Sequence, residues 1–148
     1  MGIRELAIRA WTLLFPKRAA AYRGSRGVGQ RWERLAERKL KAAGYTILDR
    51  NFHARFGEID LVAEENGVVC FVEVKGRKGP RFGAPAEAVT FEKRRRVAHA
   101  ARVYALRRRL GNRPCRFDVV SIVESPAGVV VEIFRGAFDD PHDAVRHR

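Results

Sequence analysis

The segment GEIDLVAEENGVVCFVEVKGR, residues 57–77, contains two apolar runs on either side of Asn66-Gly67. An Asn-Gly pair between two such runs is the strongest short-range signal for a β-hairpin with a two-residue turn. We therefore expect strands over residues 59–63 and 68–74, joined by this turn. Every position from 68 to 72 is apolar, which indicates that the second strand is buried on both faces of a sheet.

The register of this hairpin places acidic residues opposite one another. A two-residue turn puts Asp60 opposite Glu73 and Glu58 opposite Lys75, all on one face, because side chains alternate along a strand. Opposed carboxylates destabilise a sheet. A divalent cation resolves this conflict, since Mg²⁺ is typically held by one or two carboxylates and keeps several waters. Plain surface ion pairs, such as Glu58 with Lys75, are the alternative.

Lys75 stands two residues after Glu73 on the same face. An ammonium group there can orient or help deprotonate an attacking water, or neutralise charge that develops on a phosphate. Other catalytic patterns are missing from the sequence, which has no G-x-S-x-G, S-x-x-K, Walker or G-x-G-x-x-G pattern. His53 and His99 stand at no recognisable spacing from a carboxylate. The residues therefore favour metal-assisted phosphodiester hydrolysis.

Further helices and strands flank the hairpin. Apolar residues at helical spacing end at Gly44, and a second, basic helix begins at Thr90 and ends at Gly111. We expect helices over residues 30–43 and 90–110, a loop over 76–85, and additional strands over 45–48, 117–123 and 129–134. The order of helix, three strands, helix and two strands predicts an α/β domain with a mixed sheet.

Basic residues dominate the charge of the chain. Its 148 residues include 30 Lys+Arg and 17 Asp+Glu, which gives a formal net charge of +13. Arg far outnumbers Lys, and because Arg binds phosphates in a bidentate manner, nucleic acid is the favoured partner. Codon bias with a solvated surface is the alternative. No apolar stretch reaches the roughly 18–20 residues of a transmembrane segment. Cys70 and Cys115 form no CxxC motif, which favours buried thiols in the cytoplasm over zinc or disulfides.

The expected domain spans residues 29–136 and is flanked by two other segments. Residues 1–28 form a basic N-terminal extension, in which residues 3–15 have the spacing of a short amphipathic helix. Such a helix would pack on the domain, on a partner protein or on a membrane surface. Residues 137–148 are expected to be a flexible tail.

Residues 57–77 resemble the D-(x)n-E-x-K core of the PD-(D/E)XK nuclease superfamily, which includes restriction endonucleases and archaeal Holliday-junction resolvases. More narrowly, residues 29–124 resemble the YraN-like family of small bacterial proteins. The matching segments are GQRWERLAERKLKAAGYTILDRN, GEIDLVA, FVEVKGR, RFGAPAEAV and RFDVV. The resemblance implies a restriction-endonuclease-like αβββαβ core, with a central mixed β-sheet flanked by helices.

The resemblance also implies roles for individual residues. Asp60 and Glu73 match the metal-binding acidic pair, and Lys75 matches the active-site lysine. The Val74 carbonyl would be a backbone metal ligand. Glu33 matches an acidic residue on the first helix of resolvase-like members, where it makes an additional or water-mediated metal contact. An ordinary acidic residue that favours the helix dipole is the alternative for Glu33.

Basic residues near the expected site are candidates for contacts with the phosphate backbone. Each Arg or Lys that contacts a phosphate steepens the salt dependence of binding. The candidates lie after the E-x-K strand and at the start of the second helix: Arg77, Lys78, Arg81, Lys93 and Arg94. A solvated lysine is the alternative for Lys93. Phe52 and Phe56, beside His53 and Arg55, are candidates for contacts with bases.

Together these features predict an endonuclease that depends on Mg²⁺ or Mn²⁺. DNA is favoured over RNA as the substrate, and branched or damaged DNA is the expected form. The alternative is a non-catalytic nucleic-acid-binding module that retains the nuclease fold. The sequence leaves open whether the protein works as a homodimer.

Overall fold

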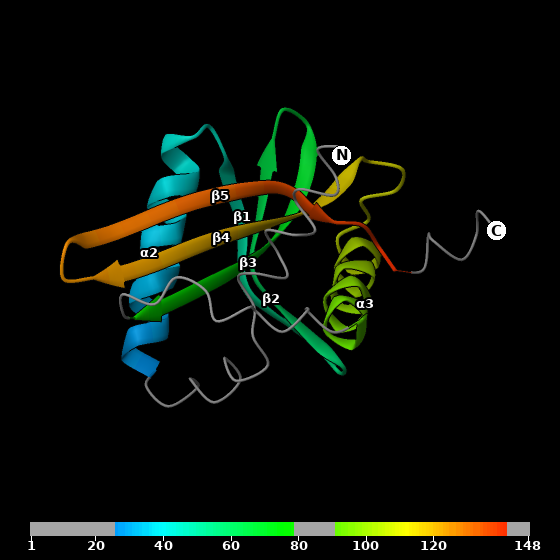
Figure 1. Cartoon of the computed structure of the whole chain (residues 1–148). Helices are drawn as coiled ribbons and strands as arrows, with labels where there is room; N and C mark the ends of the chain where they lie inside the picture. Colours follow the sequence, from blue (N-terminus) through cyan, green and yellow to red (C-terminus); the bar gives the residue numbers. More distant parts are fainter. Residues whose placement is uncertain (1–25, 79–90, 142–148) are drawn as a thin grey trace, which may run out of the picture.

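The computed structural model describes residues 26–78 and 91–141, and Figure 1 shows how its elements are arranged. In chain order they are α2 (Arg26–Ala42), β1 (Thr46–Ala54), β2 (Gly57–Glu65), β3 (Val68–Lys78), α3 (Phe91–Arg107), β4 (Cys115–Ser125) and β5 (Gly128–Phe138). The predicted order of elements is confirmed. The expected amphipathic helix at residues 3–15 and the predicted first residue of the second helix, Thr90, lie outside the described residues. Across residues 26–78 and 91–141, no helix has the length and apolar character to cross a membrane.

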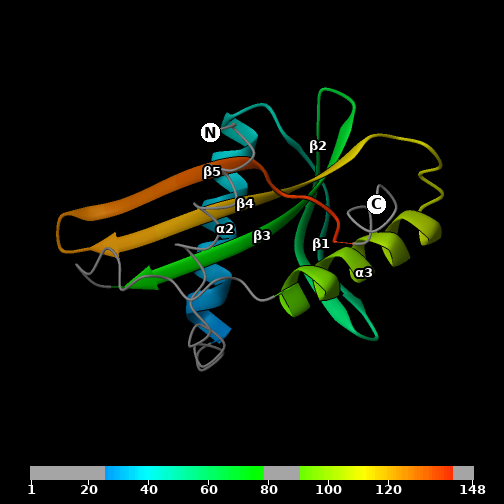
Figure 2. The ribbon, with the colours of Figure 1, turned by 45° about the vertical axis from the view of Figure 1, so that its right-hand side comes forward.

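The strands form one mixed sheet in the order β1-β2-β3-β4-β5. β3 and β4 run parallel, and the other neighbours are antiparallel. The two helices cover opposite faces of this sheet (Figure 2), and the side chains of β3 alternate between them. Cys70 and Val72 pack on the α2 side, whereas Val69 and Phe71 pack on the α3 side. The prediction that β3 is buried on both faces is confirmed, and the architecture agrees with the restriction-endonuclease-like core.

The Asn66-Gly67 turn forms as predicted. Both residues have positive φ, 51° and 80°, as a type I′ turn requires, and Glu65 pairs with Val68. The ladder between β2 and β3 then runs as far as Leu61 and Val72. The predicted pairs of Asp60 with Glu73 and Glu58 with Lys75 are therefore not rungs of this ladder, and that part of the register prediction is wrong.

The cause of the early end is a contact between β2 and α3. The first residues of β2 stay paired with β1, down to Gly57 opposite Ala54. Gly57 lies so close to α3 that a Cβ there would be 2.2 Å from the Arg96 carbonyl oxygen. β2 thus turns away from β3 toward α3, and Ile59 packs on the α3 side while Leu61 packs on the α2 side.

Both helices end in the same hydrogen-bonded motif. After α2, Gly44 has φ 95° and the Tyr45 amide donates to the Leu40 carbonyl at 3.0 Å, which is the Schellman arrangement. The predicted stop at Gly44 is confirmed. After α3, Arg109 takes the left-handed position with φ 53° and Leu110 donates back to the helix. The second helix ends before the predicted Leu110 because an arginine, not Gly111, occupies that position.

The domain extends beyond the predicted boundary at residue 136. Ala137 and Phe138 are the last residues of β5 and are buried. The Phe138 ring stacks on Phe117 with centroids 4.6 Å apart, and Asp140 forms an ion pair with Arg102 at 2.8 Å. The expected flexible tail is therefore wrong for its first residues, because this aromatic contact holds them on the α3 side of the sheet.

A buried ionic cluster, which the sequence did not predict, joins β2, β4 and β5. Asp118 has no exposed surface, and it accepts hydrogen bonds from the Tyr45 hydroxyl, the Arg116 Nε and the Gly136 amide, each at 2.9 Å. Glu65 accepts hydrogen bonds from both Arg116 and Arg135. Asp118 and Glu65 are the buried charges of the cluster, and buried charges are tolerated only when they are paired and hydrogen-bonded. They therefore depend on Arg116 and on the partly exposed Arg135.

We expect the free energy of unfolding to decrease as the pH falls from about 4.5 to about 2. Hydrogen bonds from Arg135 and then Arg116 lower the pKa of Glu65 from 4.5 to about 2. A carboxylate with a lowered pKa contributes stability above its unfolded-state pKa and loses it as the pH approaches the folded-state value. Urea unfolding between pH 2 and pH 6 measures the change, and Glu65→Gln should flatten the curve.

Glu37→Gln is the matched control for that experiment. Arg50 and Lys41 also lower the pKa of Glu37 to about 2, but their side chains are 54% and 56% exposed. Exposed ion pairs contribute only about 0.2–1 kcal/mol. A Glu37→Gln curve as flat as that of Glu65→Gln would contradict a special role for the buried cluster.

Candidate metal centre

β2 and β3 separate at Asp60, and a side chain bridges them there. The Asp60 carboxylate oxygen Oδ2 accepts a 2.8 Å hydrogen bond from the Val74 amide N–H. The bond gives the Val74 N–H an acceptor at a position beyond the last pair of the β2–β3 ladder. It also holds Asp60, the aspartate of the D-(x)n-E-x-K pattern, next to Val74, which lies between Glu73 and Lys75.

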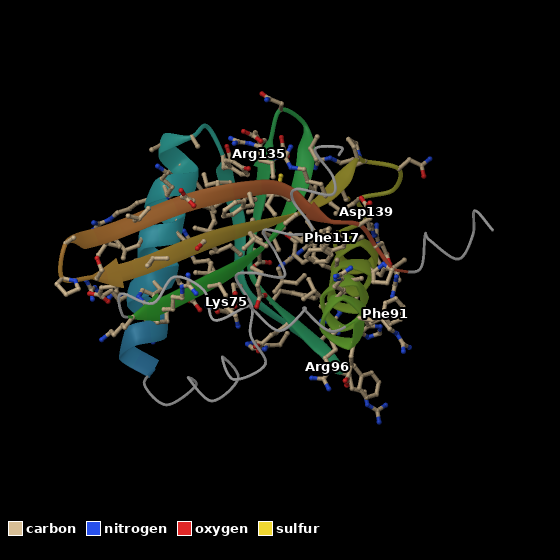
Figure 3. The ribbon with its side chains drawn as sticks, viewed as in Figure 1. Lys75, Phe91, Arg96, Phe117, Arg135 and Asp139 are labelled. Carbon is tan, nitrogen blue, oxygen red and sulfur yellow. The ribbon has the colours of Figure 1, made fainter. Side chains whose placement is uncertain are left out.

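Glu73 and Lys75 flank that hydrogen bond along β3. Glu73 is only 7% exposed, and Lys75 is half-buried. Phe71 packs on the α3 side of the sheet, so the alternation of a strand places Glu73 and Lys75 on the same side. Figure 3 shows Lys75 on β3, beside the stretch where β2 turns toward α3. The structure thus brings Asp60, Glu73, Val74 and Lys75 into one neighbourhood, through the bend in β2 rather than through the predicted ladder.

Trp32 of α2 packs directly beside this neighbourhood. A Cβ built on Gly76 would lie 2.0 Å from Cδ2 of the Trp32 ring. The indole therefore rests on the backbone immediately after Lys75, and only glycine leaves room for it. Trp32 is 7% exposed and belongs to the core on the α2 side.

We expect Gly76→Ala to destabilise the protein by about 1–3 kcal/mol, the usual cost of overpacking a core. The added methyl group must displace the indole or move the strand that carries Glu73 and Lys75. Thermal unfolding measures the loss. Gly29→Ala is the control, because a Cβ there meets nothing within 4 Å, and an equal loss in both variants would contradict the packing argument.

Glu33, the third acidic candidate, faces a different neighbour. Its Oε2 atom accepts a 3.4 Å hydrogen bond from Nδ2 of Asn51 on β1. Among residues 26–78 and 91–141, no three His, Cys, Asp or Glu side chains are grouped in a way that could hold a metal ion. Glu33 is therefore not brought together with Asp60 and Glu73 as a third direct ligand.

The residues present nevertheless fit a hard divalent cation. The donors are the carboxylates of Asp60 and Glu73 and the carbonyl of Val74, all oxygen, as Mg²⁺ and Mn²⁺ prefer. Glu73 is 7% exposed, and its carboxylate has enough acceptor positions to bind a cation in addition to its other contacts. One hydrogen bond to Oδ2 does not exhaust Asp60, because an ionised carboxylate has about four acceptor positions.

The basic residues predicted to contact phosphates are only partly described. Lys78 ends β3 and is exposed, and Arg77 and Arg94 are half-buried. Lys93 lies on α3, but its side chain is outside the described part of the structure, as is the whole of Arg81.

Burial raises the pKa of Cys70 to about 12, so this thiol is held in its unreactive protonated form.

The hairpin formed by β1 and β2 brings together His53 and Glu58, a pair that was not predicted from the sequence. His53 pairs with Glu58 across β1 and β2, and its Nδ1 lies 3.5 Å from the Glu58 Oε2. The signal was the spacing of these residues on either side of Arg55-Phe56, which is a second two-residue turn. Both residues line a cavity between the hairpin tip and α3, together with His99.

Comparison with known proteins finds matches over most of the α/β domain. Residues 32–122 match the family described as "Uncharacterised protein family UPF0102". A UPF0102 protein of Symbiobacterium thermophilum is 50% identical over 104 residues, which cover 70% of this chain and 88% of the relative. A UPF0102 protein of Anaeromyxobacter sp. is 48% identical over 114 residues, which cover 77% of this chain and 86% of the relative. A UPF0102 protein of Myxococcus xanthus is 43% identical over 122 residues, which cover 82% of this chain and 97% of the relative.

Proposed function

Since the chain belongs to the UPF0102 family of uncharacterised proteins, we propose a function from the site itself: a divalent-metal-dependent nuclease that hydrolyses phosphodiester bonds of DNA. The observation that carries the proposal is the hydrogen bond from the Val74 amide to Asp60 Oδ2. It joins the two halves of the D-(x)n-E-x-K pattern where β2 leaves β3.

The carboxylates of Asp60 and Glu73 and the carbonyl of Val74 would hold the cation. Bound there, Mg²⁺ or Mn²⁺ supplies Lewis-acid chemistry and lowers the pKa of water. In the reaction, a water oxygen forms a bond to phosphorus and the bond from phosphorus to one sugar oxygen breaks. One proton of the water passes to the departing alcohol, and the other stays on the phosphate monoester.

Lys75 acts on the substrate from the same side of β3 as Glu73. Its ammonium group orients the attacking water or neutralises the charge that builds up on the phosphate oxygens in the transition state. The half-buried position of Lys75 supports this role, because electrostatic stabilisation is stronger where solvent is partly excluded. Glu33 would support the site from α2 through a water rather than as a direct ligand.

The test is a panel of branched, single-stranded and duplex DNA and of matched RNA, incubated with the protein in Mg²⁺, in Mn²⁺ or in EDTA. We expect cleavage of at least one DNA form that needs the cation and is lost in Asp60→Ala. Cleavage that survives unchanged in Asp60→Ala, or in EDTA, would overturn the proposal. The panel also separates DNA from RNA as the substrate.

A second candidate function is a nucleic-acid-binding module without catalysis. The net charge of +13 favours it, because excess positive charge alone is enough to attract a nucleic acid. Such a module would bind DNA with a steep salt dependence but would show no metal affinity that depends on Asp60.

A further inference from the structure

A cavity of about 880 Å³ lies between the tip of the first hairpin, residues 53–58, and the first three turns of α3, residues 92–102. We call it the hairpin groove. Figure 3 shows Arg96 beside this hairpin tip, at the end of α3 where Phe91 also lies. Small-molecule sites usually measure about 300–1,000 Å³, so the hairpin groove has room for a nucleotide. None of the residues proposed to hold the metal lines it.

The charge of the hairpin groove is positive. Four arginines line it, Arg55, Arg95, Arg96 and Arg102, against two glutamates, Glu58 and Glu92. Arg96 forms an ion pair with Glu92 at 2.7 Å, and Arg102 forms one with Asp140 at 2.8 Å. Arg55 and Arg95 instead lie over aromatic rings, so these two guanidinium groups are the best placed to meet a phosphate.

Exposed aromatic rings accompany those two arginines. Phe56 is 63% exposed at the hairpin tip, with the Arg55 guanidinium 5.1 Å from its ring centroid and the His99 ring at 5.9 Å. Phe91, at the start of α3, is 59% exposed and has Arg95 at 5.9 Å. Aromatic faces combined with a basic groove are typical of proteins that bind single-stranded nucleic acid.

The hairpin groove is connected to the candidate metal centre by β2. Gly57 lines the groove, and Asp60 follows three residues later on the same strand. Three residues of a strand span about 10 Å at roughly 3.3 Å each. That length corresponds to about three stacked nucleotides at roughly 3.4 Å each. A strand whose phosphate lies at Asp60 would therefore reach the groove within a few nucleotides.

We propose that the hairpin groove binds an unpaired stretch of the substrate, with a base stacked on Phe56 and phosphates held by Arg55 and Arg95. This inference rests on the proposed function and adds a substrate class to it. The substrate would be DNA that has unpaired nucleotides within a few positions of the cleaved bond. A fully paired duplex presents no free base face to Phe56.

The test measures binding without cleavage, so that its outcome is independent of the activity. Fluorescence anisotropy follows a labelled 12-residue oligo(dT) with the full chain in EDTA, in an Asp60→Asn background. We expect Phe56→Ala, which removes the stacking ring, and Arg95→Ala, which removes a phosphate contact, each to weaken oligo(dT) binding by about ten-fold. Phe56→Trp should retain affinity, and duplex binding should change little in Phe56→Ala.

Two exposed residues away from the groove supply the controls. Leu106→Ala removes an 80%-exposed apolar side chain at the far end of α3, and Arg38→Ala removes an exposed charge from α2. Affinity that falls as much in these controls as in the groove variants would overturn the inference. So would a poly-glutamate peptide that binds as tightly as oligo(dT) regardless of Phe56, because the groove would then take acidic peptides. Loss of cleavage alone, with Phe56-dependent binding intact, would count against the proposed nuclease and not against the groove.

Discussion

Glu73→Gln is expected to reduce metal-dependent cleavage by on the order of 10³-fold, because a metal ligand in a phosphoryl-transfer site supplies several kcal/mol of transition-state stabilisation. Glu73 is 7% exposed, so truncation to alanine would leave a hole in β3. Glutamine keeps the volume and removes only the charge. Single-turnover cleavage at saturating enzyme measures the chemical step.

Glu132→Gln is the matched control for that measurement, because it makes the same chemical change at an exposed position of β5. Thermal unfolding should show that both variants remain folded. Equal cleavage by Glu73→Gln and the wild-type protein would contradict the assignment of Glu73.

Lys75→Met should lose cleavage and keep metal affinity, since Lys75 acts on water or phosphate and not on the cation.

Asp118→Ala is expected to lower the free energy of unfolding by about 3–5 kcal/mol, the cost of breaking a buried ion pair by removing one partner. Asp118 is fully buried, and its loss leaves Arg116, Tyr45 and the Gly136 amide without their shared acceptor. A loss of this size is a large part of the roughly 5–15 kcal/mol of a typical domain. Urea unfolding at pH 7 measures it.

The conservative variant Asp118→Asn and the exposed control Asp139→Ala complete that experiment. Asparagine keeps one acceptor oxygen, so its loss should fall between those of the other two variants. Asp139→Ala should stay within about 0.5 kcal/mol of the wild-type protein, as surface substitutions usually do. If Asp118→Ala lowers the free energy of unfolding no more than Asp139→Ala does, the cluster of Asp118, Glu65, Arg116 and Arg135 contributes little to stability.

Local signals predicted most of the fold. The Asn66-Gly67 turn, the doubly buried strand after it and the stop at Gly44 depend on neighbours within a few residues, and each is confirmed. The last residues of β5 were missed because Phe138 is held by Phe117, which is distant in sequence. The Asp118 cluster was missed for the same reason, since Tyr45, Glu65 and Arg135 are distant in sequence from Arg116 and Asp118.

The candidate site was predicted in its residues but not in its geometry. A regular two-residue hairpin places Asp60 opposite Glu73 and Glu58 opposite Lys75, yet the ladder already ends at Leu61 and Val72 because α3 draws β2 away at Gly57. The contact between Gly57 and α3 joins residues far apart in sequence, so the hairpin sequence alone does not predict it. The result still brings Asp60 to β3, through its side chain and the Val74 amide. The pairing of His53 with Glu58 could not be predicted because the predicted strand ended at residue 48, whereas β1 continues to Ala54 and includes His53.

Titration calorimetry of Mn²⁺ tests the central claim, that Asp60 and Glu73 form a metal site, most directly. Asp60→Asn is the sharpest variant, because an asparagine oxygen can still accept the Val74 amide hydrogen bond. We predict one Mn²⁺ site in the wild-type protein, weakened at least about ten-fold in Asp60→Asn and in Glu73→Gln, and unchanged in the exposed control Asp139→Asn. Mn²⁺ affinity that stays the same in both site variants would contradict the claim.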